Sequence, residues 1–434
     1  MDRLYFGRGL RKISSDRLYL YTALNVVCLF CIYVLLFFDL GELRSFFWYY
    51  HDNIDDTGMD FYNSMIYVRG RTPYTKFDTL YPPLANLFYW LLYKTVPKSY
   101  SSGWPDTFMG ALRNRRTKTD LRVVQSTTVL FLVFIVVCVF LIYLLAMYYE
   151  PGKKRATILA FDLLTAFGTL YAFERGNIIL LAVLLTTFFI FGRKSENKIV
   201  RELSYIALAL AAGLKLYPAV FGILLIRDKN IKGAVRTVIY GILAFFLPFV
   251  FFEGVEGIKI FFSILTKFEK DTLAPFKVST IISKVPEYLL GKFVDMSAYT
   301  AAIESVAGVI DKVFLVLMLL LAFACRKERD CLTVLFIATL FLQGTSSYCL
   351  IFSLPCLMVM LEDSDDKYDF SFVFVALLSL PLPLMRYSPR VKLNYITMFQ
   401  EVIVLGLTLY MIVIAIVDLK ARIGQKSRMV KSEV

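Results

Sequence analysis

Long apolar blocks without charge alternate along the chain with short connectors rich in lysine and arginine. Residues 123–149 carry no charge, and the blocks 19–38, 237–252 and 399–417 contain Glu401 as their single charged residue. About 20 apolar residues are needed to cross a hydrocarbon core about 30 Å thick. The blocks therefore predict membrane-spanning helices, because a membrane β-barrel would instead show short strands of alternating polarity.

Shorter blocks of the same kind complete the pattern. The first block is followed by no small-residue cleavage site, so we interpret it as a spanning helix rather than a signal peptide. No internal repeat or linker to a soluble domain interrupts the series. We therefore expect one all-α integral membrane domain, residues 1–434, with about 12–13 transmembrane helices and exterior juxtamembrane helices. The predicted spans are residues 18–38, 83–96, 123–149, 157–173, 177–192, 203–226, 237–252, 310–325, 331–344, 346–361, 370–385 and 399–417.

The composition agrees with a membrane protein. Hydrophobic residues make up 58% of the 434 positions and charged residues 19%. A soluble domain has about 45–50% apolar and about 25% charged residues. The net charge of +13 is spread over the connectors, which is typical of positive-inside bias and of contact with anionic lipid. Because the basic residues form no clustered face or motif, we expect no nucleic-acid partner.

The basic connectors also predict the topology. Both ends of the chain carry several lysines and arginines, so both are expected in the cytoplasm. The short basic connectors between spans are expected on the same side, and they lie at residues 153–155, 193–201, 227–236 and 326–329.

A simple count of straight crossings does not satisfy all of these connectors. Downstream of residue 153 the count works if 203–226 is a short hairpin that turns near 215–218. Between residues 83 and 149 one crossing is left over, so either 83–96 is re-entrant or one connector breaks the rule. Re-entrant and hairpin segments occur in membranes where they line a protein-filled or watery cavity, so the pattern also points to an intramembrane cavity.

Two polar segments are longer than the other connectors. Residues 41–81 follow the first span, are rich in aspartate and are expected on the exterior as a functional loop. Residues 253–311 form a second exterior loop with nearly balanced charge and interleaved Phe, Ile and Tyr. Loops of this length are usually functional, and both are expected to hold helices on the membrane surface.

The sequence predicts neither a metal site nor a disulfide framework. The seven cysteines lie in or at the edge of apolar blocks, and an odd number outside the long polar loops favours buried thiols over a disulfide framework. His51 is the single histidine, so a zinc site is not expected. The aspartates near Asp55 could offer oxygen ligands to a divalent cation, but our prediction is that no metal and no cofactor is required.

Four groups of polar residues stand beside or inside the apolar blocks. They are 55–60 with Gly70, Tyr74 and 81–84; 174–177; 213–218; and 346–348 with 354–355. Each group also has a purely structural interpretation. In the same order, these are a solvated acidic loop, a polar turn at the membrane interface, a lysine whose side chain reaches the membrane surface, and a simple turn. Lys215 carries the strongest signal, because a lysine inside an apolar block costs about 2.5–3.5 kcal/mol and is most naturally met by a phosphate.

In order and spacing these groups resemble the GT-C membrane glycosyltransferases, and most closely glycosyltransferase family 87, the polyprenyl-phosphate-mannose-dependent mannosyltransferases. The family shows an acidic residue early in the first exterior loop, a Gly-x-x-x-Tyr turn, Tyr-Pro-Pro-Leu, Gly-Asn between spans, and a Gly-Leu…Lys-x-Tyr-Pro segment before a basic connector. The matching positions here are Asp60, Gly70 with Tyr74, 81–84, Gly176 with Asn177, and 213–218 followed by Arg227. The resemblance covers residues 50–245 well, although the connector 97–122 is longer and more basic than the family pattern.

The resemblance implies an inverting transferase that moves a sugar, with mannose favoured, from a polyprenyl-phosphate donor to a hydroxyl of a glycan or glycolipid acceptor. One carboxylate must take the hydroxyl proton, and Asp60 is the first choice, with Asp55 and Asp56 as alternatives. The leaving phosphate needs positive charge and hydrogen bonds, which we assign to a second group of residues. These are Lys215, Arg175, Asn177 and Arg71, while Tyr62, Tyr74 and Tyr81 are assigned to the sugar or acceptor.

Two other classes of protein remain open. A multi-pass transporter or flippase of a lipid-linked or polar solute would typically show internal repeats with broken helices in both halves, and the sequence shows none. A polymerase or ligase of surface polysaccharide would rely more on arginine in the exterior loops. The chain contains no Asn-x-Ser/Thr sequon, which favours a prokaryotic plasma membrane, with the active site on its exterior face.

Overall fold

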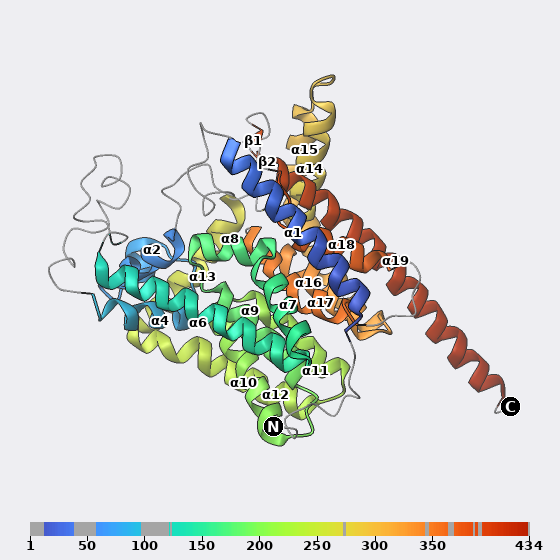
Figure 1. Ribbon diagram of the computed structural model, residues 1–434, viewed down its shortest axis with the longest axis horizontal. Helices are drawn as coiled ribbons and strands as arrows, with labels where there is room; N and C mark the ends of the chain where they lie inside the picture. Colours follow the sequence, from blue (N-terminus) through green and yellow to red (C-terminus); the bar gives the residue numbers. More distant parts are fainter. Residues whose placement is uncertain are drawn as a thin grey trace.

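The computed structural model describes residues 13–38, 58–96, 121, 124–271, 275–342, 347–362, 369–384, 387–388 and 393–432. Nearly all regular structure in this part of the chain is helical (Figure 1), which confirms the predicted all-α class. The exception is a short antiparallel pair, β1 (Tyr387–Ser388) and β2 (Leu393–Asn394), in which Tyr387 lies opposite Asn394.

The helices follow one another with short breaks. In chain order they are α1 (Ser15–Phe38), α2 (Met59–Tyr67), α3 (Pro73–Phe77), α4 (Pro83–Tyr93), α6 (Gln125–Tyr149), α7 (Lys153–Leu164), α8 (Phe167–Arg175), α9 (Ile179–Gly192), α10 (Lys198–Leu214), α11 (Ile223–Arg227), α12 (Ile231–Phe246), α13 (Gly254–Asp271), α14 (Val278–Leu290), α15 (Ser297–Ala324), α16 (Glu328–Phe341), α17 (Leu354–Met360), α18 (Phe370–Ser379) and α19 (Tyr395–Ser432), with the 3-10 helices η6 (Tyr217–Gly222), η7 (Leu247–Phe251) and η8 (Ser347–Ser353).

Five helical segments of the described chain are long and apolar enough to cross a membrane. They are Ser15–Val34, Gln125–Tyr149, Ile231–Phe251, Ser297–Ala324 and Tyr395–Gly424. The helices α7 and α8 pass the same test only as a pair, and they are bent by 59° at the break between them. The described chain therefore has fewer uninterrupted spans than the about 12–13 predicted from the apolar blocks. Several of those blocks instead form short apolar helices, among them α9, α17 and α18.

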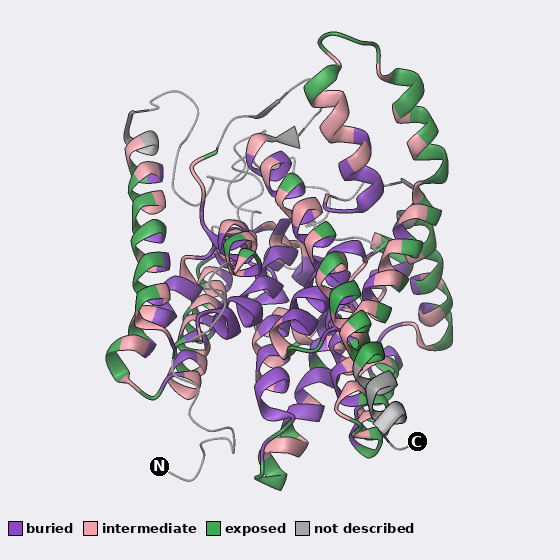
Figure 2. Cartoon of the chain, turned by 90° about the vertical axis from the view of Figure 1, so that its right-hand side faces the viewer, coloured by how far each residue is buried: buried purple, intermediate pink, exposed green. Residues whose placement is uncertain are grey.

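The outer helices present apolar side chains to their surroundings. On α6, residues such as Leu132, Val136 and Phe140 are more than half exposed, although α6 carries no charge. Buried residues gather at the centre of the bundle (Figure 2). An apolar outside around a packed inside is expected where lipid, rather than water, surrounds a protein.

The helices α4 and α10 belong to the two segments, 83–96 and 203–226, for which the number of membrane crossings was ambiguous. With 11 residues α4 is about 16 Å long, about half of the hydrocarbon core, so it does not cross the core by itself. At Leu214 α10 ends, because Lys215 adopts an extended conformation and Pro218 in the following turn cannot continue the α-helical hydrogen bonds. The segment η6 then packs back against α10. The length of α4 and the turn after α10 agree with the re-entrant interpretation of 83–96 and the hairpin interpretation of 203–226, which both stay predictions.

The backbones of α8 and η8 approach each other closely. A Cβ atom on Gly168 would lie 2.3 Å from the backbone nitrogen of Ile351, so only glycine allows this contact. The approach brings the ring of Tyr171 to 6.3 Å from the ring of Tyr348, measured between centroids.

The second predicted loop, 253–311, is almost entirely helical where it is described. It contains α13, α14 and the first half of α15, which begins at Ser297 rather than near residue 310. Two buried hydrogen bonds tie α14 to α15, because the backbone N–H and the hydroxyl of Ser279 both donate to Asp311, at 3.0 and 2.7 Å.

The two predicted loops are joined by Glu253. Its carboxylate accepts the backbone N–H groups of Tyr74 and Thr75, at 3.1 and 3.0 Å, and the hydroxyl of Thr75. These N–H groups belong to the first turn of α3, so Glu253 caps that helix from a distant part of the chain.

Removing this cap should destabilise the protein measurably. We expect Glu253→Ala to lower the free energy of unfolding by about 0.5–2 kcal/mol, the usual effect of losing a helix cap. Glu253 has a left-handed backbone conformation, with φ of 58°. Alanine would be strained in the same way at this position, so the substitution tests mainly the loss of the side chain. A thermal-shift assay in detergent would measure it, with Glu256→Ala, which removes an exposed pair with Lys259, as the control. Equal effects of the two substitutions would contradict the capping role.

Candidate active site

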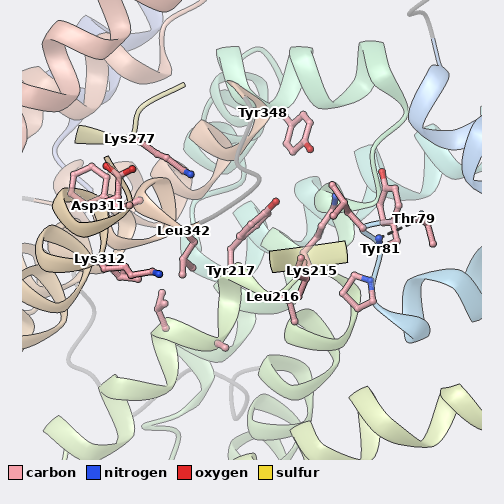
Figure 3. A pocket seen from close by; sticks show the side chains of 18 of the residues that line it. Thr79, Tyr81, Lys215, Leu216, Tyr217, Lys277, Asp311, Lys312, Leu342 and Tyr348 are labelled. Carbon is pink, nitrogen blue, oxygen red and sulfur yellow. Dashed lines mark hydrogen bonds between the residues drawn. The ribbon is translucent and has the colours of Figure 1, made fainter. Parts of the chain in front are cut away.

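A cavity of about 820 Å³ lies where the two predicted loops meet the helix bundle. One wall comes from α2, the segment 78–82, the α10–η6 junction and η8, and the other from α13, α14 and α15. Figure 3 shows Lys215 and Tyr81 at one end, Lys277, Asp311 and Lys312 at the other, and Tyr217 with Leu342 between them. Such a volume lies in the upper part of the range of about 300–1000 Å³ that is typical of small-molecule sites.

An acidic residue of the first wall is held by two polar partners. The guanidinium of Arg175 donates to both carboxylate oxygens of Asp60, from Nη2 to Oδ1 at 2.8 Å and from Nε to Oδ2 at 2.9 Å. The amide of Asn177 donates to Oδ2 at 2.6 Å. Paired, fork-like contacts of this kind fix the orientation of a carboxylate as well as its charge.

Local backbone geometry brings these residues together. The N–H of Gly58, just before α2, donates to the carbonyl of Glu174 at 2.8 Å, which places Asp60 beside the end of α8. Gly176 ends α8 with φ of 64°. A side chain there would be strained, and its Cβ would lie 2.6 Å from the ring of Phe131. The Gly-Asn pair therefore turns the chain sharply, so that Asn177 points back at Asp60.

The electrostatic surroundings keep Asp60 ionised. Burial raises the pKa of the Asp60 carboxyl, and the charge and hydrogen bonds of Arg175 lower it. The charge of Lys215 and the hydrogen bond from Asn177 act in the same direction, so the pKa lies below its ordinary value.

Lys215 is buried among aromatic rings at the same end of the cavity. Its side chain is only 7% exposed, and its ammonium nitrogen lies 4.0 Å from the centroid of the Tyr81 ring and 5.4 Å from that of Tyr348. Ring faces stabilise a desolvated cation by about 0.5–2 kcal/mol, less than a full counter-charge would. The ammonium is therefore available to an anion in the cavity.

The structure brings together five of the predicted residues and separates others. Asp60, Lys215 and Tyr81 line the cavity, and Arg175 and Asn177 hold Asp60. Asn177 also lies 3.4 Å from the hydroxyl of Tyr81. The predicted alternatives Asp55 and Asp56 lie outside the described residues.

Three other predicted binding residues neither line the cavity nor hold Asp60. Tyr62 is buried against Phe61 and Phe131 in the protein interior. The buried ring of Tyr74 packs on Phe249, and its hydroxyl accepts a hydrogen bond from the side-chain amide of Asn86. The third residue is Arg71, which is exposed at the protein surface.

Arg71 lies at a turn with φ of 59°, and its guanidinium stacks on the ring of Trp90, 4.9 Å from the centroid. This contact holds the 68–72 turn against α4. It gives Arg71 a structural partner outside the cavity.

Sequence reasoning did not identify several residues that line the cavity. Tyr348 was part of a weak motif, Tyr217 belonged to the 213–218 motif but was assigned no role, and Tyr67 was among 27 tyrosines with no distinguishing pattern. Lys277 lies in the second predicted loop, where the nearly balanced charge singled out no individual residue, and Lys312 lies just after this loop, in the predicted span 310–325. Among the described residues no group of three or more His, Cys, Asp or Glu side chains is arranged to hold a metal ion.

The apolar spans and the partly buried carboxylate–guanidinium cluster beside a large cavity define a multi-pass membrane protein with an internal site. The profile of glycosyltransferase family 87 matches residues 80–353, more than half of the chain. The chain therefore belongs to glycosyltransferase family 87, and it is a membrane glycosyltransferase. This confirms the resemblance seen in the motifs. The matched region includes Tyr81, Lys215 and Tyr348 but begins after Asp60. No curated protein matches the sequence significantly.

Proposed function

We propose that this protein is an inverting transferase that moves a sugar, with mannose as the first candidate, from a polyprenyl-phosphate donor to a hydroxyl group of a glycan or glycolipid acceptor. The reaction would take place on the exterior face of a plasma membrane, which fits the basic connectors assigned to the opposite side. The observation that carries the proposal is the pairing, in one cavity, of an oriented carboxylate and a buried cation, Asp60 and Lys215.

Asp60 is suited to act as the general base. A carboxylate has about four lone-pair positions, and the hydrogen bonds from Arg175 and Asn177 occupy three of them, two on Oδ2 and one on Oδ1. The remaining position on Oδ1 can accept the proton of the acceptor hydroxyl. Because the pKa of Asp60 is low, the proton would move late, after formation of the bond to the anomeric carbon has made the hydroxyl acidic.

Lys215 is suited to receive the leaving group. As the acceptor oxygen bonds to the anomeric carbon, the bond from that carbon to the phosphate oxygen breaks, and its electron pair stays on the phosphate. The developing negative charge is stabilised by a cation already placed in a site with little water. Because Arg175 and Asn177 both bind the base, their main task is to orient Asp60 rather than to hold the phosphate.

The second wall offers an apolar surface for the lipid of the donor. Ala307, Gly308 and Leu315 of α15 line the cavity, as do Leu265 of α13 and Val220 of η6. A polyprenyl chain would bury its methyl-branched units against these side chains, and each buried CH₂ group stabilises binding by about 0.8 kcal/mol.

The direct test is sugar transfer by the purified full-length protein. Radiolabelled polyprenyl-phosphate mannose, glucose and arabinose would be supplied with extracted membrane lipids and glycans as acceptors. We expect transfer with inversion at the anomeric carbon from one of these donors. Transfer from a nucleotide sugar instead, with none from the lipid phosphates, would contradict the proposed donor.

The pH profile tests the link between Arg175 and Asp60. The base form of Asp60 exists only above its pKa, so kcat should fall on the acid side as the pH drops through that low value. In Arg175→Gln, burial still raises the pKa of Asp60 but the opposing charge of Arg175 is lost. The acid limb of the kcat–pH profile should therefore move to higher pH. Arg175→Lys should move it less.

A matched control is Arg71→Gln, which removes a guanidinium from the segment that contains Asp60, where Arg71 stacks on Trp90. Its acid limb should coincide with that of the wild type. An unchanged acid limb in Arg175→Gln would show that Asp60 is not the group that titrates.

A further inference from the structure

Basic connectors that are far apart in the sequence meet at a second cavity, of about 660 Å³. The connectors 193–201, 227–236 and 326–329, all predicted to face the cytoplasm, contribute to its lining together with α19. No described residue lines both this cavity and the candidate active site. The charged residues that line it are the cations Lys194, Arg227, Lys229, Arg326 and Arg422 and the carboxylates Asp228 and Glu328.

The two lining carboxylates are already paired. Arg193, whose side chain is buried, donates from Nε to Asp228 at 2.9 Å and from Nη2 to Glu328 at 2.5 Å. The amino group of Lys194 contacts the other oxygen of each carboxylate, at 2.9 and 3.3 Å. Asp228 and Glu328 are therefore neutralised by these two partners, and the charges of the remaining four lining cations are left over.

Two of those four cations lie side by side at the end of α15. Nη2 of Arg227 donates to the carbonyls of Cys325 and Arg326, both at 3.0 Å. Arg422 donates to the carbonyls of Phe323 and Cys325, at 2.8 and 2.9 Å. Because both guanidinium groups contact the Cys325 oxygen, their Nη2 atoms lie no more than about 6 Å apart. Neither group forms an ion pair with a carboxylate of the described chain.

The carbonyls offset only part of this positive charge. The last carbonyl groups of a helix together carry about half a negative charge, against two full positive charges. The nearby carboxylate of Asp418 accepts the backbone N–H of Arg326 at 2.6 Å. Each guanidinium has five N–H groups and uses two of them here, so three remain for an anion. Two fixed guanidinium groups with spare donors are suited to the oxygens of a phosphate.

An exposed apolar face of α15 leads away from this cavity. Phe323 lines the cavity, and Leu320 and Val316 follow at helical spacing, all more than a third exposed. The candidate membrane span of α15 ends at Ala324 and that of α19 at Gly424. The cations therefore lie where the hydrocarbon core of a membrane gives way to its headgroups.

We propose that this cavity binds the headgroup of an anionic phospholipid such as phosphatidylglycerol, with an acyl chain along the exposed face of α15. Arg227 and Arg422 hold the phosphate, and Lys229 and Arg326 add positive charge around it. A soluble phosphate would meet the same cations but would leave the apolar face uncovered. The bound lipid is a structural partner that links α11, α15 and α19, and not a substrate, so the proposal is independent of the sugar-transfer reaction.

Equilibrium binding of radiolabelled dioleoyl phosphatidylglycerol to the full-length protein in neutral detergent tests this site. We expect saturable binding that phosphatidylcholine does not displace and that about 1 M salt weakens, because the Debye length is then about 3 Å. In the double variant Lys229→Gln/Arg326→Gln the Kd should rise about 25-fold, since each basic residue near an anionic headgroup contributes about a factor of five. Neither side chain donates a hydrogen bond to the described chain, so the variant should fold.

The matched control is the double variant Lys198→Gln/Lys232→Gln. It removes two exposed lysines from the same set of connectors, and neither of them lines the cavity. Its Kd for phosphatidylglycerol should stay within about twofold of the wild type. Lys215→Met, which changes the candidate active site instead, should also leave this Kd within about twofold.

Four results would overturn the proposal. An unchanged Kd in Lys229→Gln/Arg326→Gln would remove the site, and an equal loss in the control variant would show only a diffuse attraction to the basic face. Loss of binding in Lys215→Met alone would place the lipid in the candidate active site. Equally strong competition by glycerophosphoglycerol, the same headgroup without acyl chains, would assign the cavity to a soluble phosphate.

Discussion

Replacement of Asp60 by asparagine should reduce kcat for sugar transfer by about 10²- to 10⁴-fold, the usual contribution of a positioned general base. Asparagine keeps the size of the side chain and an oxygen that can accept from Arg175. It has no basic oxygen for the proton of the acceptor hydroxyl. The measurement is single-turnover transfer from the radiolabelled lipid donor, with binding of the donor determined separately.

The same substitution also weakens an ion pair that holds α2 against α8, so stability must be measured alongside activity. Asp162→Asn is the matched control, because Asp162 is a buried carboxylate that accepts from Thr22 and Asn25 away from the cavity. It should retain transfer even if its thermal midpoint falls. If Asp60→Asn transferred sugar at a rate within tenfold of the wild type, Asp60 would not be the base.

Replacement of Lys215 by methionine should lower kcat/KM for the donor by about 10²- to 10³-fold, the range observed when one group that stabilises developing negative charge is removed. Methionine retains most of the apolar stem that packs against Tyr81, so the change removes mainly the charge. Both donor affinity and kcat should fall, since the phosphate becomes more negative as the bond to the sugar breaks.

Lys94→Met offers a comparison for the loss of a stacked lysine. The ammonium of Lys94 lies 4.8 Å from the centroid of the Trp90 ring, but Lys94 does not line the cavity. Its removal should leave kcat/KM within about twofold, since an exposed cation–ring contact is worth only about 0.5–1 kcal/mol of stability. A similar small effect at Lys215 would remove that residue from the phosphate site.

In the proposed reaction, Asp60 accepts the proton and Lys215 stabilises the phosphate within the same cavity. Asp60 is charged and held in place by Arg175, while Lys215 rests on rings that leave its charge largely uncompensated. A base and a cation of this kind would neutralise each other in direct contact. Their attachment to different partners would keep both available for the proposed reaction.

Much of the site could be predicted from residue type and local pattern. A lysine inside an apolar block is costly in any fold, which singled out Lys215 before its surroundings were known. The Gly176-Asn177 pair marked a turn between spans, and Asp60 an acidic residue next to a short amphipathic segment. Patterns could not separate Tyr81 from Tyr62 and Tyr74, because an aromatic residue at helical spacing suits the interior and a cavity wall equally well.

The amino-acid sequence by itself determined the class of this protein, because the length and purity of its apolar blocks allow only helices in a membrane. Its motifs also determined the family. Tertiary structure alone decided which residues meet: Asp60 and Arg175 are 115 residues apart, and their contact depends on the turn at Gly176 and on how α2 packs against α8. Only packing could also reveal that Lys277 faces the same cavity as Lys215, since hydropathy records how apolar a segment is and not the direction in which its side chains point.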